Sequence, residues 1–571
     1  MRRSPPAAGL LLGAIVGIAD AIILQTNFGR SQGPVSVAPL TWAAVIWTWI
    51  TIGCLTGVVF ASPRWGPFRG AALALTGPCL LLLGRGTTPF KALLHLSTSQ
   101  VALIWAALSV GICLAAAFVR FERARSLWPY AIGSVISALL LVWFAANVRV
   151  GGSTGARSVV PGKHNVALIV LDTVRHDDVV AQMPQLQAFA RGALTFDNAW
   201  SSAPWTVPAH FALLTGADPW TVPFPSVARG FEYAGPRLAE DFRSRGYDTS
   251  AVFANPLLNE GAGFARGFEE FTVSIQSRVC RSAVGALLGK SVTHGGPAMP
   301  LCGWLIAPQV SARAMQFVRQ KSGRPYFVAM NFIDAHDPYY VPPGCRDRSF
   351  HAVPRRDQQK LLDASPGRRL DPLMVARTHG QYRMAMRCMD RTLGSLLRAL
   401  DDGNTVIAVV GDHGEQFGEH GWGGHGNTLY RQLLHVPLIL KIPGRVPARV
   451  NDPVSTADLF ATLIRASQAG RMRAPIPLLD AGWRRPVIAN FDMRRHRSLE
   501  GGFSIVRGDL HFTRSTSGRE NLFDYRADPL EDLPLSPSTH RPIIDPMRAR
   551  LLHAAGQQRR RVEFDALGYL N

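Results

Sequence analysis

The hydrophobic positions of the chain follow two different patterns, which divide it near residue 148. Five long apolar segments come first, at roughly 7–25, 40–61, 70–84, 99–119 and 127–147. Four of them approach the ~20 residues that an α-helix needs to cross a bilayer, whereas segment 70–84 is shorter and contains Pro78. Beyond residue 164, short apolar runs alternate with polar stretches, as in a soluble domain. We predict an all-α transmembrane region of about five helices at 1–148, a linker at 149–164 and a folded domain at 165–571.

The charges in the short loops predict the orientation of the apolar segments. One side would carry Arg2, Arg3, Arg64, Arg69, Arg120, Arg123 and Arg125, and the other only Arg30, Arg85 and Lys91. Since cytoplasmic loops are enriched in Lys and Arg, the first side is expected in the cytoplasm. With five crossings, the domain at 165–571 lies on the outer, periplasmic or extracellular, face of a cell membrane. This expectation requires segment 70–84 to span the bilayer.

Two apolar runs in the folded domain end in acidic residues. Residues 165–171 (NVALIVL) precede Asp172, and residues 405–410 (TVIAVV) precede Gly411, Asp412 and His413. Unbroken apolar runs of this length are typical of buried parallel strands, and ligands of α/β sheets bind at the carboxyl ends of such strands. A single Asp after a strand is more often a helix cap. Two such strands, one with an adjacent histidine, predict a divalent metal site at Asp172, Asp412 and His413.

Three further residues carry candidate chemistry. Thr206 lies between Pro204 and Pro208 at the start of a short helix predicted to end at Gly216. There a hydroxyl could serve as both metal ligand and nucleophile, although such a Thr is ordinarily just an N-cap. His336 follows the apolar strand YFVAMNF, and His425 occupies a Gly-rich loop. Either imidazole could donate to an oxyanion or protonate a leaving group, and either alone could be an ordinary surface histidine.

The net charge and the cysteines say less about the function than these candidate site residues do. The net charge of +21 is compatible with an anionic surface or with a general arginine bias, and no zinc-finger or RNA-recognition signature supports nucleic acid as a partner. Four of the seven cysteines fall in the polar part: Cys280, Cys302, Cys345 and Cys388. Outside the cytoplasm these could form two disulfides, with Cys280–Cys302 the preferred pair, or some could remain free.

Taken in order, the motifs resemble the sulfatase family of the alkaline-phosphatase-like superfamily across roughly residues 164–535. They are LIVLDTVR, PWTVPAHFALLTG, HDPY, GDHGEQFGEHG, HGNTLYRQLLHVPLILKIPG and LFDYRADPLED. The resemblance implies an α/β sandwich with a mixed, mostly parallel central sheet. It also implies that Asp172, Asp412, His413 and Thr206 bind the metal, that Thr206 is the nucleophile, and that His336 and His425 hold or protonate the substrate ester.

Three departures from the family pattern affect the expected chemistry. Sulfatases convert Cys or Ser at the nucleophile position to formylglycine, and Thr206 cannot become that aldehyde. Thr173 replaces the second Asp of the usual pair, and His210 replaces the Arg of the family signature. Asp390 matches an acidic helix position for which we expect a structural role. A Thr nucleophile resembles that of phosphoethanolamine transferases and lipoteichoic-acid synthases, which also join five membrane helices to an exterior catalytic domain.

We therefore expect a membrane-anchored, metal-dependent hydrolase or transferase acting on a phosphate or sulfate ester, with lipid or envelope glycan as candidate substrates. The cofactor would be a divalent ion, Mn²⁺, Zn²⁺, Mg²⁺ or Ca²⁺. Two alternatives stay open at this point: a sulfuric-ester hydrolase that uses unmodified Thr206, and a catalytically inactive membrane scaffold with the same fold.

Overall fold

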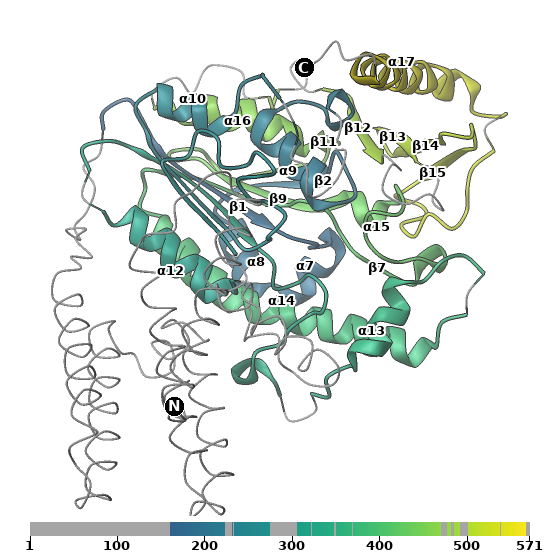
Figure 1. Ribbon diagram of the computed structural model, residues 1–571, viewed down its shortest axis with the longest axis horizontal. Helices are drawn as coiled ribbons and strands as arrows, with labels where there is room; N and C mark the ends of the chain where they lie inside the picture. The colour runs from purple at the N-terminus through teal and green to yellow at the C-terminus, as the bar shows by residue number, and fades with distance from the viewer. Residues whose placement is uncertain are drawn as a thin grey trace, which may run out of the picture. The chain divides into compact units, whose positions relative to one another are not determined.

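The described part of the chain in this computed structural model lies almost wholly C-terminal to the apolar segments. It comprises residues 160–222, 231, 233–274, 305–320, 322–347, 350–367, 369–469, 477–480, 485–491, 501–536 and 538–566 (Figure 1). The five predicted membrane segments, most of the linker, and Cys280 and Cys302 lie outside these residues. Within the described residues, no helix is long and apolar enough for a membrane crossing.

A nine-stranded sheet forms the centre of the described domain. Its strands are β1 (Asn165–Leu171), β2 (Leu194–Trp200), β3 (Asp248–Phe253), β4 (Glu270–Val273), β5 (Tyr326–Phe332), β6 (Thr405–Gly411), β9 (His435–Lys441), β10 (Ala448–Val450) and β11 (Val454–Ser455). They are ordered β10-β2-β9-β6-β1-β5-β3-β4, with β11 beside β2. Only β9 among these strands runs antiparallel to its neighbours. The predicted mixed, mostly parallel sheet is confirmed.

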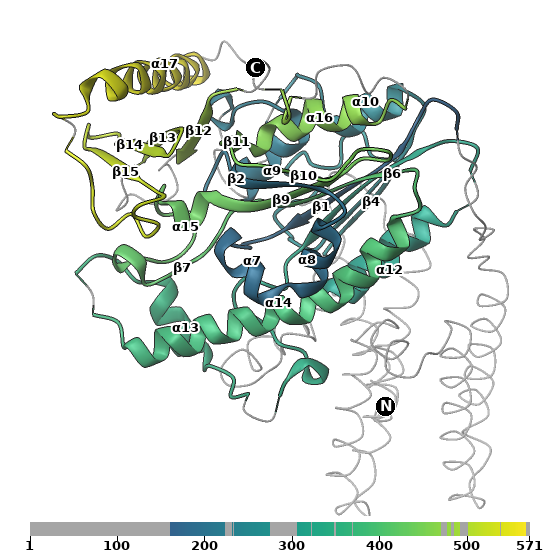
Figure 2. The same cartoon turned by 180° about the vertical axis from the view of Figure 1, so that it is seen from behind.

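Helices cover both faces of this sheet (Figures 1 and 2). One face carries α9 (Thr206–Thr215), α10 (Leu238–Ser244) and α16 (Leu459–Ala466), and the other carries α7 (His176–Gln182), α8 (Pro184–Ala190), α12 (Ala307–Val318) and α14 (Pro372–Leu400). Alternate residues of β1 face opposite sides, so Leu168 joins one core cluster and Ile169 the other. This burial on both faces explains why β1 is apolar at nearly every position.

A second, antiparallel sheet lies toward the C-terminus and packs against helix α17 (Arg541–Ala566). Its strands are β12 (Val487–Phe491), β13 (Gly502–Arg507), β14 (Leu510–Ser515) and β15 (Glu520–Asp524). It adjoins the central sheet near β11, and the Asn490 amide donates to the Ser202 carbonyl at 3.0 Å. The sequence patterns did not identify this sheet, whose short amphipathic strands lack the long apolar runs of the central one.

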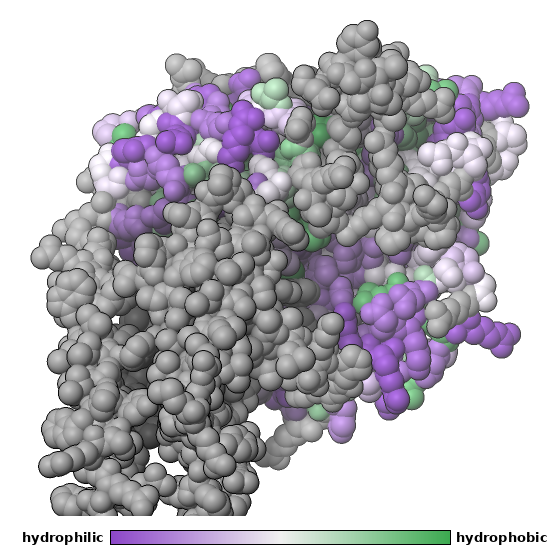
Figure 3. Space-filling view, viewed as in Figure 1, coloured by the Kyte–Doolittle hydropathy of each residue, from purple (hydrophilic) through white to green (hydrophobic). Residues whose placement is uncertain are grey.

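The remaining elements are short or peripheral. They are α13 (Arg355–Leu362), α15 (Arg431–Leu434), the ribbon β7 (Gln416–Phe417) and β8 (Gly423–Gly424), and the 3₁₀ turns η3 (Pro219–Thr221), η4 (Pro343–Cys345), η5 (Glu419–Gly421) and η6 (Thr456–Asp458). In Figure 3 the visible described surface is mostly hydrophilic.

A disulfide joins two of the four cysteines in the polar part of the chain. Cys345, in η4, is bonded to Cys388 in α14, with a Cα–Cα distance of 5.7 Å. It attaches the segment that follows His336 to the longest helix of the domain. The preferred pair Cys280–Cys302 falls outside the described residues and stays a prediction.

Candidate active site

The predicted metal ligands meet at the carboxyl ends of two adjacent central strands. In the parallel pair β1–β6, Leu171 lies opposite Gly411, so the residues that follow them are neighbours in space. His413 Nε2 lies 3.8 Å from Asp172 Oδ1 and 3.4 Å from Asp412 Oδ2, and all three side chains are buried. The predicted grouping of Asp172, Asp412 and His413 is therefore present.

The chemistry of this group fits a bound divalent cation. Asp172 Oδ1 and Asp412 Oδ2 are buried without a hydrogen-bond partner among the described residues. His413 Nδ1 lies 2.9 Å from the Gly414 carbonyl, which fixes the proton there and leaves the Nε2 lone pair facing the two carboxylates. Burial lowers the pKa of His413 well below its ordinary value, so the imidazole is neutral. Buried carboxylate oxygens without donors are costly unless a cation compensates them.

Thr206 is the first residue of α9, and its hydroxyl belongs to the same cluster. Thr206 Oγ1 lies 3.3 Å from His413 Nε2, and the residue is almost fully buried. The helix ends at Thr215, and Gly216 caps it with φ +67°, as predicted from the sequence. Its N-terminal dipole favours negative charge at Thr206. A hydroxyl here can lose its proton more readily than a serine or threonine in water.

Two asparagines that the sequence did not single out hold Asp172 and Thr206. Asn255 Nδ2 donates to Asp172 Oδ2 at 2.8 Å and lies 3.3 Å from Thr206 Oγ1. Asn331 Nδ2 donates to the same carboxylate oxygen at 3.2 Å. Asn331 lies near the end of the predicted strand YFVAMNF, and Asn255 follows β3. A polar residue at the carboxyl end of a strand is the sequence feature that could have identified both asparagines. Both amides orient the carboxylate from the side away from His413.

Thr173 does not replace the missing second carboxylate. Its backbone has φ +60°, its hydroxyl donates to the Asp172 carbonyl at 2.7 Å, and its amide donates to Asp412 Oδ1 at 3.2 Å. These contacts fix Asp412 rather than offering an oxygen ligand. Asn255 and Asn331 therefore supply polar contacts on the side where a second acid is absent.

His336 and His425, to which the resemblance assigns contact with the substrate ester, lie beside each other and next to the cluster. Their ring centroids are 4.8 Å apart, and the His425 ring is 4.6 Å from that of His413. Each has a carboxylate partner: Asp337 Oδ1 lies 3.0 Å from His336 Nδ1, and Glu415 Oε1 lies 3.1 Å from His425 Nδ1. Burial opposes protonation, but Asp337 raises the pKa of His336 to about 10 and Glu415 raises that of His425. Both rings can therefore donate protons to an oxyanion.

His210 occupies the position of the family arginine. Its Nδ1 lies 3.0 Å from the Thr206 carbonyl one helical turn earlier, and its Nε2 lies 3.3 Å from Asn331 Nδ2. Asp412 Oδ2 is also 3.4 Å from His210 Nδ1. The imidazole thus contacts the first turn of α9 and links Thr206 to Asn331 and Asp412.

Asp390 has the structural role expected from the sequence. It lies in α14, and its carboxylate oxygens accept hydrogen bonds from the backbone amides of Gln185 and Leu186 at 2.8 and 2.9 Å. These amides belong to the first turn of α8, where they lack partners within the helix. The Asp390 carboxylate therefore caps the N-terminus of α8, which is a structural role and not a catalytic one.

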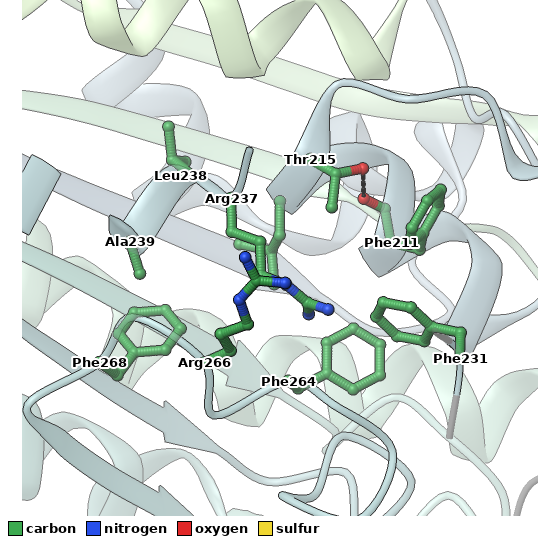
Figure 4. Close-up of a pocket in the computed structure, with 10 residues that line it drawn as sticks. Phe211, Thr215, Phe231, Arg237, Leu238, Ala239, Phe264, Arg266 and Phe268 are labelled. Carbon is green, nitrogen blue, oxygen red and sulfur yellow. Dashed lines mark hydrogen bonds between the residues drawn. The ribbon is translucent and has the colours of Figure 1, made fainter. Parts of the chain in front are cut away.

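A small apolar pocket lies behind α9 and is separate from the cluster (Figure 4). Four aromatic rings line it, those of Phe211, Phe231, Phe264 and Phe268, together with two guanidinium groups. One of these, Arg266, pairs with Glu240 at 2.5 Å. No predicted metal ligand or catalytic residue lines this pocket, so it is not the reactive centre.

Comparisons with known proteins identify the family and the fold that the chain resembles. The sequence model of the Sulfatase family matches residues 164–469. Human iduronate 2-sulfatase is 25% identical over 476 residues, covering 73% of this chain and 84% of that protein. Choline-sulfatase of Rhizobium meliloti (strain 1021) is 23% identical over 445 residues, covering 67% and 84%. The structure of a phosphonate monoester hydrolase of Agrobacterium radiobacter shares the fold with a TM-score of 0.54 at 19% identity, over 69% of this chain and 96% of that one.

Proposed function

The chain belongs to the sulfatase family, which makes it a sulfate or phosphate ester hydrolase, and from this premise we propose that it acts on phosphate esters with Thr206 as nucleophile. One observation carries the proposal. Thr206 Oγ1 is buried at a helix N-terminus, 3.3 Å from His413 Nε2 and within reach of the unpartnered carboxylate oxygens of the cluster. A hydroxyl in such surroundings can be deprotonated and held for attack.

The residues that would hold a divalent cation are Asp172, Asp412, His413 and Thr206. Such an ion, when bound, supplies Lewis-acid stabilisation of the nucleophile and of the ester oxygens. The donor set of carboxylates, one imidazole and one hydroxyl is compatible with Mn²⁺, Zn²⁺, Mg²⁺ or Ca²⁺.

The chain's own side chains account for the remaining chemistry. Asn255 holds the Thr206 hydroxyl against Asp172, which aims Oγ1 into the cluster. Thr206 Oγ1 gives up its proton to water and bonds to phosphorus, the ester P–O bond breaks, and the departing alkoxide takes a proton from an imidazolium, His336 or His425. The phosphoryl group on Thr206 is then transferred to water, which is hydrolysis, or to an acceptor hydroxyl, which is transfer.

Phosphorus is favoured over sulfur because of the residue at position 206. Formylglycine expels sulfate through breakdown of an aldehyde hydrate, and threonine cannot form that aldehyde. A phosphothreonine instead needs only a second in-line displacement. The rival activity is hydrolysis of a sulfate ester by unmodified Thr206, and the rival class is an inactive scaffold.

We propose further that the enzyme is anchored in the cell membrane with residues 165–571 on the outer face. The support is the five apolar segments and the arginine-rich loops that would lie in the cytoplasm. An active site held there would meet lipid or envelope glycan esters. Alkaline-phosphatase fusions after residues 63, 86, 122 and 150 test this topology, and an active fusion at 63 with an inactive one at 150 would reverse the assignment.

The activity is tested with full-length protein and a pair of matched aryl esters. Wild-type protein, Thr206→Ala and Thr206→Ser are assayed on the aryl phosphate and the aryl sulfate with each of the four metals. We expect phosphate ester turnover in the wild type, its loss by at least a hundredfold in Thr206→Ala, and partial retention in Thr206→Ser. Phosphopeptide mapping should find the phosphoryl group on residue 206.

Three outcomes would contradict parts of the proposal. Full activity of Thr206→Ala on every ester removes the nucleophile assignment. Turnover of the sulfate alone establishes the sulfuric-ester rival. A protein with no turnover on either ester and no bound ion dependent on Asp412 is the inactive scaffold.

A further inference from the structure

A second group of metal-binding side chains lies outside the active-site cluster. It consists of His176 and Asp177, at the start of α7, and His435, at the start of β9. Asp177 Oδ1 lies 3.7 Å from His176 Nδ1 and 3.6 Å from His435 Nδ1. Ligands of a tetrahedral zinc ion are separated by about 3.4 Å, given metal–ligand distances near 2.1 Å. The two measured separations are close to the edges of such a tetrahedron.

From this geometry we propose that His176, Asp177 and His435 bind a second divalent transition-metal ion, of the Zn²⁺ class, with water as the fourth ligand. Two imidazoles and one carboxylate favour Zn²⁺ over the oxygen-preferring Mg²⁺ and Ca²⁺. This inference does not rest on the proposed function, because none of the three residues belongs to the active-site cluster.

His435 provides the independent observation that points to a ligand. Its Nε2 lies 2.8 Å from the Asp197 carbonyl, which fixes the ring proton on Nε2. Its Nδ1 is then a bare lone pair, buried and without any hydrogen-bond partner among the described residues. A histidine whose far nitrogen donates to a backbone carbonyl is the usual arrangement of a metal-binding imidazole. Burial also lowers the pKa of His435 to about 3, so the ring is neutral.

The carboxylate beside His435 Nδ1 is that of Asp177, whose oxygens only accept hydrogen bonds when ionised. Because the ring proton is on Nε2, Nδ1 has no proton to donate, so the 3.6 Å contact with Asp177 Oδ1 joins two acceptors. The His176 and His435 ring centroids are 4.1 Å apart and the ring planes are tilted by 35°, so protonation of both would place two positive charges close together. A cation shared by the three groups satisfies them together.

One positive group, the Arg431 guanidinium, faces the proposed site and is paired with Asp177. Arg431 donates to both oxygens of Asp177, at 2.8 and 3.1 Å. The Arg431 backbone amide in turn donates to Glu531 Oε2 at 2.8 Å, and Glu531 Oε1 lies 2.6 Å from His511 Nδ1. Since a carboxylate oxygen has two lone pairs, Asp177 Oδ1 can bind a cation while accepting from Arg431. The site is open to entry because the Asp177 side chain is 43% exposed.

A metal here would fasten the segment after Asp172 to the antiparallel strand β9. His176 lies four residues after Asp172, and His435 is the first residue of β9. The ion would therefore act as a structural clamp beside the active site, and it should stabilise the folded chain.

The test counts zinc in four full-length proteins, the wild type, His176→Gln, Asp412→Asn and the double variant. Each is dialysed against Zn²⁺ with a competing chelator, and bound zinc is measured by mass spectrometry of the metal. We expect the wild type to bind two zinc ions, His176→Gln and Asp412→Asn to bind one each, and the double variant to bind none. His176 is partly exposed, so its replacement should not disturb folding, which far-UV circular dichroism checks. His553→Gln, at an exposed position of α17, is the matched control and should keep two.

Thermal unfolding in the Asp412→Asn background gives a second readout. Zinc should raise the Tm of this protein and leave that of the double variant unchanged, and Mg²⁺ should raise neither. The proposal is overturned if the wild type binds one ion that is lost in Asp412→Asn, or if His176→Gln and His435→Asn both keep two. One ion, lost only in His176→Gln, would support this site and refute the active-site metal.

Discussion

Replacing Asp337 by Asn should move the alkaline limb of the pH–rate profile toward neutral pH. The Asp337 carboxylate lies 3.0 Å from His336 Nδ1 and shares its other oxygen with Arg355 at 3.1 Å. Asparagine keeps the size of the side chain and removes the charge. If protonated His336 serves the leaving group, activity falls as pH rises through its pKa, and that pKa depends on Asp337.

The size of the effect follows from the distance and the burial of the pair. Against the opposing effect of burial, Asp337, with smaller contributions from Asp172 and Glu415, raises the pKa of His336 from 6.5 to about 10, which corresponds to about 5 kcal/mol of differential interaction. Coulomb attraction at this separation, with an effective dielectric constant of about 20, gives a similar ~5 kcal/mol. Both side chains keep some exposure, and a divalent cation bound at Asp172 and Asp412 would oppose protonation. We therefore expect Asp337→Asn to remove about half of this interaction energy, which moves the alkaline limb by roughly two pH units.

The assay measures kcat/KM on the aryl phosphate from about pH 5 to pH 10 for the wild type and Asp337→Asn. At about pH 8.5 the variant should be slower by roughly fourfold and near pH 10 by roughly fiftyfold, and near pH 5.5 the two should be similar. Asp357→Asn is the matched control, since that carboxylate lies on the neighbouring helix α13 and pairs with Lys360. Superimposable limbs for the wild type and Asp337→Asn would refute the assignment of His336 as proton donor.

Three further changes test other parts of the site. Asp390→Ala removes the cap of α8 and should lower the free energy of unfolding in urea by about 2 kcal/mol, and an unchanged value would remove its structural role. Asp334, whose Oδ2 is buried without a partner, has its pKa raised by burial to about 6, so its stabilising contribution is lost as pH rises from about 4 through 6. As pH rises from about 4 to about 8, the free energy of unfolding of Asp334→Asn should therefore increase by about 2 kcal/mol relative to that of the wild type. A difference between the two proteins that does not change with pH would contradict this. Gly414→Ala would place a Cβ 2.0 Å from the Gln432 carbonyl, so bound metal and activity should both be lost, and retention of either would show that the backbone can shift.

The sequence by itself determined the elements that deliver the reactive side chains. The apolar runs 165–171 and 326–332 are strands β1 and β5 with the predicted bounds, and run 405–410 is β6 with one additional residue. The helix at Thr206 ends before Gly216, as its glycine indicated. These features are local, because a strand buried on both faces must be apolar throughout, and a left-handed cap favours glycine. The membrane segments, the domain boundaries and the preferred disulfide stay predictions.

Only the tertiary structure decided how the reactive groups are held. Asn255 and Asn331 contact Asp172 although they are 83 and 159 residues from it, because the sheet places β5 beside β1 and β3 beside β5. The same reason applies to His435, which is far from His176 in the chain and meets it only through the position of β9. Pattern and spacing report what a residue can do within its own element. The order of strands in the sheet determines which distant residue completes its coordination, its hydrogen bonds and its charge.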